Sequence, residues 1–231
     1  MKPYYDEKGI TLYNADCLPA MKEMPDNAFD LAIVDPPYQN NDAIGIKNGK
    51  AHAANRKDYR LFENVKPTPE YFVELKRVSR NQIIWGGNFL GLSGGYICWN
   101  KEGTAFGEGE LAYCSMINSV RFVKYTWNGM IQQNMKHKEI RIHPTQKPVA
   151  LYEWLLNNYA KPGQTILDTH LGSGSIAIAC HDYGYDLTAY EIDKEYFEAA
   201  TERIERHKAQ GQLFQAGETM TVESIKGRVG N

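Results

Sequence analysis

The sequence predicts an α/β fold with a doubly wound, mostly parallel sheet that carries an antiparallel edge. Apolar runs at residues 29–34 and 165–168 are typical of parallel strands buried on both faces. Strand and helix patterns alternate toward both ends of the chain, as they do in doubly wound sheets. Residues 96–127 carry strand patterns and few helical signals, which predicts the antiparallel edge.

In the first half of the chain, periodicity and turn residues predict strands and helices in turn. Thr68 is placed to cap a helix, and Pro69 stands at its first position, where proline is favoured. Residues 39–65 are polar, and loops of this length in compact domains are usually functional or disordered. The predicted order is a strand at 10–13, a helix at 18–24, a strand at 30–34, a loop at 39–65, a helix at 69–78 and a strand at 82–85.

The second half begins with the strands of the antiparallel edge and a polar, basic loop. Lys161, Pro162 and Gly163 end a helix that starts at Pro148. A strand–helix–strand–helix series follows and completes the parallel core. The predicted order is strands at 96–99, 111–114 and 121–127, a loop at 128–142, a helix at 148–159, a strand at 165–168, a helix at 176–183, a strand at 186–191 and a helix at 195–208.

Composition predicts one globular domain of enzyme size over residues 1–231. Hydrophobic residues make up 42% of the chain and charged residues 23%, and no apolar stretch approaches the roughly 20 residues of a membrane span. The N-terminus lacks the apolar core of a signal peptide. The four cysteines are scattered and the six histidines show no ligand spacing, so we expect free thiols in a reducing cytoplasm, no metal and no membrane association.

Positive charge is concentrated in two segments, although the net charge of the chain is −2. Residues 47–60 hold five basic residues against one acidic residue, and residues 121–147 hold six against one. Aromatic side chains lie among these cations, a mixture that can neutralise phosphates and stack on bases. Two solvated loops are the alternative. The cations expected to bind nucleic acid are Lys47, Lys50, Arg56, Lys57, Lys136, Lys138 and Arg141.

The most informative motif is Asp35-Pro36-Pro37-Tyr38, which directly follows the apolar run 29–34. Proline cannot donate to a sheet ladder, so the strand ends there, at the edge where ligands bind in open α/β sheets. Asp35 and the Pro36 carbonyl can accept the two protons of an exocyclic amine, and Tyr38 can stack on the ring that carries it. An ordinary proline turn with a surface tyrosine is the alternative.

A second motif, residues 165–175, is a strand followed by a glycine-rich turn and the start of a helix. Gly172 and Gly174 let the backbone approach a ligand, and the helix start presents N–H groups. Glu191 ends the next strand, 23 residues after Asp168, where an acidic residue grips ribose hydroxyls in nucleotide-binding folds. The phosphate-loop lysine and the three-glycine dinucleotide fingerprint are missing, which argues against triphosphate hydrolysis and a nicotinamide cofactor.

With both motifs in place, the chain resembles the amino-group DNA methyltransferases that use S-adenosylmethionine. The Asp35 motif precedes the glycine-rich loop, which is the order found in the permuted β class of that family. The resemblance covers about residues 9–206, and its most specific element is the run of residues 143–148, His-Pro-Thr-Gln-Lys-Pro. It implies a Rossmann-like methyltransferase fold in permuted order.

The resemblance also implies roles for the matching residues. Those at the amine would be Asp35, Pro36, Pro37 and Tyr38. Those at the cofactor would be Asp16, Cys17, Asp35, Thr145, Lys147, Pro148, Asp168, His170, Gly172, Ser173, Gly174, Ser175, Glu191 and Ile192. His170 departs from the pattern, because the family usually has an aromatic residue there. An imidazole packed against the cofactor and a buried neutral histidine are the two interpretations.

The implied reaction is methyl transfer from S-adenosylmethionine to the N6 amine of adenine in double-stranded DNA, since family members with aspartate at this place are usually adenine enzymes. The base would flip out of the duplex, with Tyr38 replacing its lost stacking. The alternatives are an N4-cytosine enzyme, an RNA or protein-amide methyltransferase, and a catalytically retired DNA-binding protein. The candidate partners are a second copy of the chain, in a homodimer, and a cognate restriction endonuclease. We expect a cytoplasmic enzyme, bacterial or phage-encoded, without a separate target-recognition domain.

Overall fold

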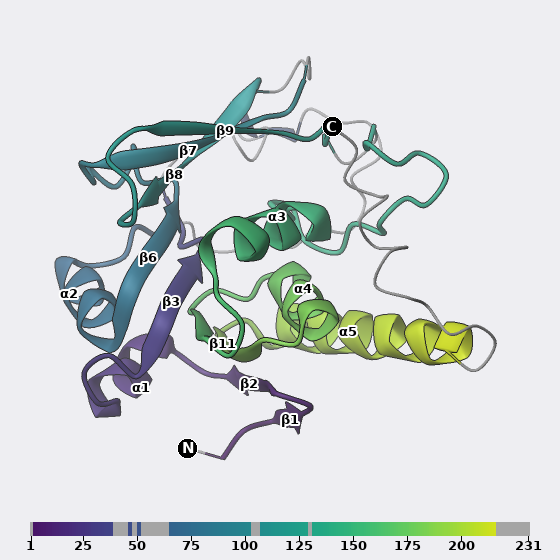
Figure 1. Ribbon diagram of the computed structural model, residues 1–231, viewed down its shortest axis with the longest axis horizontal. Coiled ribbons are helices and arrows are strands. Elements are labelled where there is room, and N and C mark those ends of the chain that lie inside the picture. The colour runs from purple at the N-terminus through teal and green to yellow at the C-terminus, as the bar shows by residue number, and fades with distance from the viewer. Residues whose placement is uncertain are drawn as a thin grey trace.

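The computed structural model describes residues 2–38, 46–47, 50–51, 65–102, 107–128 and 131–215. Among these residues, nine strands form one sheet (Figure 1). In the order in which they lie side by side, they are β1 (Tyr5–Glu7), β2 (Ile10–Asn14), β11 (Asp186–Glu191), β10 (Thr165–Asp168), β3 (Phe29–Val34), β6 (Ser79–Trp85), β8 (Gly109–Cys114), β7 (Gly95–Asn100) and β9 (Val120–Lys124). The run from β2 to β6 is parallel throughout, which confirms the predicted α/β class.

Helices lie on both faces of the sheet, as the doubly wound prediction requires. Figure 1 shows one group of helices on one side of the sheet and a second group on the other. The first pair is α1 (Cys17–Glu23) and α2 (Pro69–Val78), and the second set is α3 (Val149–Tyr159), α4 (Ser175–Tyr183) and α5 (Lys194–Gln215). Within the described residues, no helix is both long and apolar enough to cross a bilayer.

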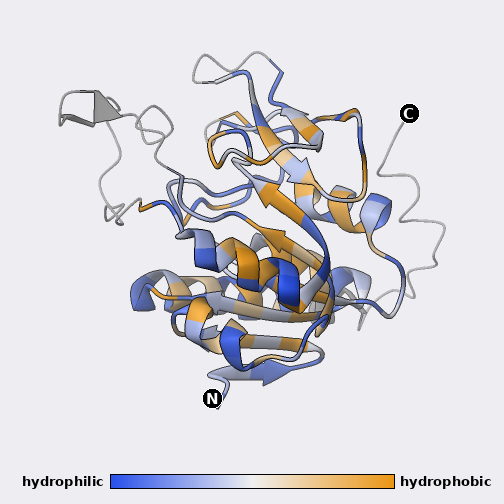
Figure 2. Cartoon of the chain, turned by 90° about the vertical axis from the view of Figure 1, so that its left-hand side faces the viewer, coloured by the Kyte–Doolittle hydropathy of each residue, from blue (hydrophilic) through white to orange (hydrophobic). Residues whose placement is uncertain are grey.

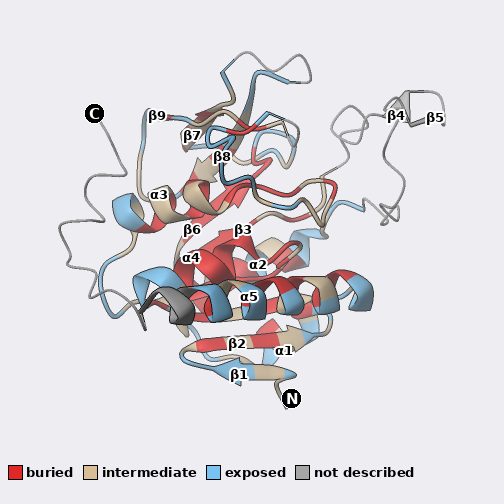
Figure 3. Ribbon diagram, turned by 90° about the vertical axis from the view of Figure 1, so that its right-hand side faces the viewer, coloured by how far each residue is buried: buried red, intermediate tan, exposed pale blue. Residues whose placement is uncertain are grey.

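The core consists of two apolar clusters, one on each face of the sheet. Successive strand residues point to opposite faces, and β3 follows this rule. Ala32 and Val34 pack in a cluster with Met21 of α1 and Leu75 of α2. Ile33 packs in the other cluster, which also holds side chains of α3, α4 and α5. Figure 2 shows hydrophobic residues concentrated in the central strands and the helices beside them, and Figure 3 shows buried and exposed residues alternating along α5.

The helix ends follow local sequence signals. Asp16 caps α1, because its side chain accepts a hydrogen bond from the Leu18 amide at 2.9 Å. Pro69 occupies the first turn of α2, as predicted. Gly174 and Gly184 stand on either side of α4 with φ values of 73° and 71°, a left-handed conformation that glycine adopts without strain.

The antiparallel edge is confirmed at β8, which pairs antiparallel with both β6 and β7. The sequence predicts the same arrangement for residues 121–127, but β9 ends at Lys124 and runs parallel to β7. The reason is its position, since β9 crosses to the outer side of β7 instead of pairing with β8. Two further pairs were not predicted: β1 beside β2, and β4 (Ile46–Lys47) with β5 (Lys50–Ala51) inside the expected loop 39–65.

The direction of winding reverses between β10 and β3. From β10 the chain continues through α4 to β11 on one side, and from β3 it continues through α2 to β6 on the other. In open α/β sheets, ligands bind at the carboxyl ends of the strands at such a switch point. Asp168 ends β10 and Asp35 directly follows β3, so both predicted motifs lie at this edge.

Candidate active site and cofactor site

Asp35 is held at the end of β3 by a lysine from a distant segment. Lys147 Nζ lies 2.5 Å from Asp35 Oδ2, and only 2% of the lysine side chain is exposed. The other carboxylate oxygen, Oδ1, is buried and meets no hydrogen-bond donor among the described residues. A buried acceptor without a donor is costly. Oδ1 is therefore well suited to accept an N–H group from a bound substrate.

Lys147 is shared between two carboxylates. Its Nζ also lies 3.2 Å from Glu110 Oε2, and 5.0 Å from the centroid of the Trp85 ring. Burial opposes the charge of Lys147, but Asp35 and Glu110 outweigh it and hold the lysine pKa well above its usual range. Burial raises the pKa of Asp35. Burial would also raise the pKa of Glu110, but Lys147 and Lys101 outweigh it and lower that pKa to about 2.

Tyr38 forms a stacked aromatic pair beside this cluster. Its ring centroid lies 5.3 Å from that of Phe89, with 8° between the ring planes. Gly86 makes room for the tyrosine, because a Cβ at this position would lie 2.2 Å from Tyr38 Cδ1. The Phe89 amide donates to the Gly86 carbonyl at 2.9 Å, so the same turn after β6 places both partners of Tyr38. Burial raises the pKa of Tyr38, which keeps its hydroxyl protonated.

The glycine-rich loop is organised by carboxylates at the ends of neighbouring strands. Glu191 accepts the Gly172 amide on Oε2 and the Asp193 amide on Oε1, each at 2.9 Å. Asp168 accepts the His170 amide at 3.0 Å. Burial raises the pKa of Asp168 to about 8 and also raises that of Glu191. A cation bound beside this loop would therefore favour the ionised form of both groups.

His170 packs against a tyrosine that the sequence did not single out. The ring centroids of His170 and Tyr71 lie 5.6 Å apart in an edge-to-face arrangement. Thr169 Oγ1 lies 2.9 Å from His170 Nδ1 and 2.6 Å from the Tyr71 hydroxyl, so it joins the two side chains. Burial lowers the pKa of His170 to about 4, which makes it neutral at pH 7. Its packing against a cofactor stays a prediction.

The segment that carries Lys147 is fastened to the start of α4. Ser175 Oγ donates to the Lys147 carbonyl at 2.7 Å. Thr145 Oγ1 lies 3.1 Å from His143 Nδ1, and the Thr145 amide donates to the same nitrogen at 3.3 Å. Burial lowers the pKa of His143 to about 4, so the imidazole is neutral and can accept. Pro148 follows directly and stands at the start of α3.

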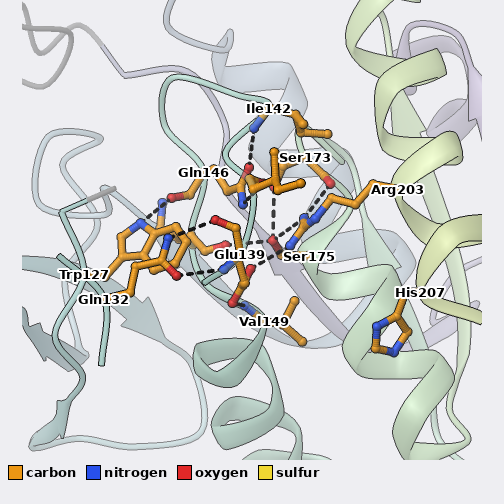
Figure 4. Close-up of polar contacts among 12 residues, drawn as sticks. Trp127, Gln132, Glu139, Ile142, Gln146, Val149, Ser173, Ser175, Arg203 and His207 are labelled. Carbon is orange, nitrogen blue, oxygen red and sulfur yellow. Dashed lines mark hydrogen bonds and ion pairs between the residues drawn. The ribbon is translucent and has the colours of Figure 1, made fainter. Parts of the chain in front are cut away.

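A buried arginine joins the same two segments from α5. Arg203 Nη1 donates to the Ser173 carbonyl at 2.8 Å and lies 2.9 Å from Ser175 Oγ (Figure 4). Its Nη2 donates to Glu139 Oε2 at 2.6 Å. Glu139 Oε1 in turn accepts the amide of Val149, the first residue of α3. The glycine-rich loop, the segment before α3 and α5 are therefore held together by one side chain.

The family of DNA methylases matches residues 108–202 of the chain. The Type II methyltransferase M2.DpnII of Streptococcus pneumoniae is 24% identical over 249 aligned positions, which cover 88% of this chain and 92% of that protein. The M1.HpyAVI–SAM complex superimposes with a TM-score of 0.52 at 20% identity, over 84% of this chain and 99% of that one. The PvuII DNA methyltransferase, described as cytosine-N4-specific, superimposes with a TM-score of 0.58 at 13% identity, over 94% and 96% of the two chains.

These matches support a DNA methyltransferase of the N6/N4 amino-group family. S-adenosylmethionine is the cofactor that this family uses, and the site at the carboxyl ends of the strands suits it. That molecule carries positive charge at its sulfonium and ammonium groups, and Asp168 and Glu191 are carboxylates that a cation would keep ionised. Gly172 has a φ of 53°, and a Cβ added there would meet no heavy atom closer than 3.8 Å. The loop thus leaves room for a ligand where a side chain would otherwise stand.

Three predicted cofactor residues of the methyltransferase lie around the ends of β2 and β11. Asp16 serves as the cap of α1, and Cys17 behind it is buried, which raises its thiol pKa to about 12. Ile192 directly follows Glu191 and is 70% exposed. Asn14 ties the two strand ends together, since its side chain donates to the Glu191 carbonyl at 2.8 Å. Contact of these residues with the cofactor stays a prediction.

Several residues of the site were missed by sequence reasoning. Glu110 stands in strand β8, whose neighbouring residues are largely apolar, and Arg203 stands beside buried Ile204 in α5. A charged residue inside an apolar pattern was the available signal, because charges are rarely buried without a partner. Tyr71 and Trp85 carried no such signal, since buried aromatic residues are ordinary core residues.

The predicted DNA-binding cations do not share one environment. Lys136 and Lys138 are exposed. Arg141 instead donates to the backbone carbonyls of His143, at 3.2 Å, and Pro144. The other four lie outside the described residues or, in β4 and β5, where side chains are not described: Lys47, Lys50, Arg56 and Lys57.

Proposed function

We propose that this methyltransferase transfers a methyl group from S-adenosylmethionine to the N6 amine of adenine in double-stranded DNA. The observation that carries the proposal is the buried Oδ1 of Asp35, without a donor among the described residues, near the stacked ring of Tyr38. An exocyclic amine on a planar base supplies the N–H group that this oxygen needs. A base in a duplex reaches such a site only by flipping out, and Tyr38 would replace its lost stacking.

The proposed chemistry depends on how the chain holds the amine. A base amine is a poor nucleophile, because its lone pair is delocalised into the ring. Acceptors at Asp35 Oδ1 and the Pro36 carbonyl favour a pyramidal nitrogen and localise the lone pair. The bound cofactor supplies an electrophilic methyl group on sulfur. Much of the acceleration then comes from holding the nitrogen in line with that methyl group.

Adenine is proposed over cytosine because of the aspartate at position 35, which members of the resembled family that methylate adenine usually share. The proposed acceptors would hold either kind of amine in the same way, and PvuII methyltransferase, described as cytosine-N4-specific, has a similar fold. Cytosine N4 is therefore the second candidate. We also propose that Asp168 neutralises positive charge on the methionine part of the cofactor. Glu191 would bind the ribose of the cofactor, and Cys17 and Ile192 would border its adenine.

On the DNA side, we propose phosphate contacts through Lys136 and Lys138 and a short target sequence. Each good bidentate base contact supplies about 1–3 kcal/mol of discrimination, so a few contacts define a short site unless two chains cooperate. A homodimer would be expected if the target proves long. Pairing with a cognate restriction endonuclease is proposed because the relative M2.DpnII is named a Type II methyltransferase.

The test is to express the chain in a host that lacks DNA methylation and to analyse the nucleosides of its DNA by mass spectrometry. N6-methyladenine is expected, and N4-methylcytosine without it would overturn the choice of base. Transfer of labelled methyl groups to duplex DNA and to RNA in vitro would separate the two nucleic acids as substrates.

Asp35→Ala should abolish transfer and leave cofactor binding nearly intact, because the main role proposed for Asp35 is at the amine and the other predicted cofactor residues stay in place. The loss of a positioned acceptor should lower the rate on the order of 10²-fold or more. Calorimetry with S-adenosylmethionine measures the binding part. A variant that keeps near wild-type turnover on DNA would remove Asp35 from the reaction.

A further inference from the structure

Glu110 stands at the active site without an assigned role. It lies on β8, with Oε2 3.2 Å from Lys147 Nζ, and the same nitrogen lies 2.5 Å from Asp35 Oδ2. We propose that Glu110 is a positioning residue for methyl transfer, which shares the charge of Lys147 so that Asp35 keeps a basic oxygen for the target amine. The proposal rests on the proposed function and deepens it.

A series of contacts between charged side chains leads away from Asp35, through Lys147 and Glu110 to Lys101. Lys147 lies between the two carboxylates, and the Trp85 ring, 5.0 Å from Nζ, covers it on another side. The outer oxygen of Glu110 accepts a hydrogen bond from Lys101. Because only 2% of the Lys147 side chain is exposed, water contributes little to balancing its charge. The two carboxylates and the two ammonium groups balance one another.

Sharing Lys147 with Glu110 changes the affinity of Asp35 for a proton. A carboxylate paired with one ammonium group of its own loses affinity for a proton, because the cation favours the ionised form. A second carboxylate on that ammonium group acts in the opposite direction. The pKa of Asp35 is accordingly raised, mainly by burial, and Glu110 contributes to the increase while Lys147 and Lys101 oppose it.

Other titratable groups face this cluster from the neighbouring elements. Tyr38 follows Asp35 in the turn after β3, Tyr152 belongs to α3, and Asp168 ends β10. Burial holds the pKa of both tyrosines above the usual range, so they stay neutral at pH 7. Asp168 is the remaining carboxyl group near Asp35, but its raised pKa keeps it mostly protonated at pH 7 in the cofactor-free protein, and it does not lie within ion-pair distance of Lys147 in the described structure. Glu110 is thus the carboxylate that competes with Asp35 for the lysine.

The competition of Asp35 and Glu110 for Lys147 matters for the proton that the target amine releases. The amine nitrogen forms a bond to the methyl carbon while the carbon–sulfur bond breaks, and its electron pair stays on sulfur. The nitrogen then loses one proton, which Asp35 Oδ1 accepts. A general base works best when its proton affinity matches this task, so loss of the Glu110 charge should slow transfer without removing any contact to the cofactor.

The direct test is the titration of the Asp35 carboxyl group, followed by carbon-13 NMR in the cofactor-free protein and assigned through Asp35→Asn. Glu110→Gln removes the charge and keeps the shape, and it should lower the Asp35 midpoint by about one pH unit or more. Lys101→Gln should raise the midpoint, because it removes a cation. Glu108→Gln is the matched control, since Glu108 is an exposed glutamate beside the start of β8 and should leave the midpoint unchanged.

Kinetics on DNA complete the test. For Glu110→Gln we expect kcat to fall on the order of 10-fold, the acid limb of its pH profile to move to lower pH, and the KM for S-adenosylmethionine to stay near that of the wild type. Glu110→Asp, which keeps the charge, should recover part of kcat. An unchanged midpoint in folded Glu110→Gln, or shifts of the same sign in Glu110→Gln and Lys101→Gln, would overturn the proposal. Because the titration needs no turnover, a wild-type protein that fails to methylate DNA would refute the proposed function separately.

Discussion

At the scale of single residues, Asp168 is the side chain whose ionisation should respond most clearly to the cofactor. Burial raises its pKa to about 8, against 3.8 for an ordinary aspartate. The folded protein therefore holds a proton that the unfolded chain releases, and the stability of the cofactor-free protein should fall as the pH rises from about 4 to 8. Above that window, the full cost of the buried charge remains.

Asp168→Asn should remove this cost, so the cofactor-free variant should melt at a higher temperature than the wild type at pH 9 and show little advantage near pH 4. It should also bind S-adenosylmethionine more weakly, because it lacks the negative charge for the cationic ligand. Thermal unfolding across pH and calorimetry measure the two effects. Asp186→Asn, an exposed aspartate at the start of β11, is the control. A difference in melting temperature that does not vary with pH would contradict the prediction.

At the scale of elements, the ion pair between buried Arg203 and half-buried Glu139 holds α5, the glycine-rich loop and the start of α3 together. Arg203→Met leaves the half-buried Glu139 carboxylate without its arginine, and it should lower the free energy of unfolding by about 3 kcal/mol. It should also weaken cofactor binding, because the loop loses the donors to Ser173 and Ser175. Urea denaturation and calorimetry check the two parts.

A second substitution distinguishes the ion pair from simple loss of packing. Arg203→Met combined with Glu139→Gln should be less destabilised than Arg203→Met alone, because the double variant leaves no unpaired charge. Arg206→Met, which truncates an exposed arginine of the same helix, should change little. Equal losses in the single and the double variant would show that the pair itself contributes nothing.

At the scale of the whole molecule, positive charge is concentrated in two segments of the chain, residues 47–60 and 121–147. Lys136→Ala with Lys138→Ala should weaken DNA binding on every sequence and lower the salt slope by about one unit for each lost phosphate contact. Binding titrations at several salt concentrations measure that slope. Lys161→Ala is the control, because this exposed lysine precedes β10 and so lies at the opposite edge of the sheet from Asp35. A slope equal to that of the wild type would assign the 128–142 segment to the solvated surface.

Much of the architecture could be predicted because its signals are local. The proline pair after β3, the glycines around α4 and the proline at the start of α2 each restrict the backbone at their own position. The direction of β9 had no such signal, because it depends on which strand the chain reaches next. The hydrogen bonds of Arg141 to backbone carbonyls could not be predicted either, since a basic loop residue has the same sequence pattern whether it faces water or a backbone carbonyl.

By itself, the sequence determined the doubly wound class, the two motifs at the carboxyl ends of β3 and β10, and the family to which these motifs point. Each of these follows from residues close together in the chain. Only the tertiary structure decided that Lys147 meets Asp35 across 112 positions, that Glu110 competes for the same lysine, and that Arg203 closes the glycine-rich loop from α5. Such contacts depend on strand order and helix packing. Burial sets the pKa values of the side chains that meet there, and no local sequence pattern shows how deeply a charged residue will be buried.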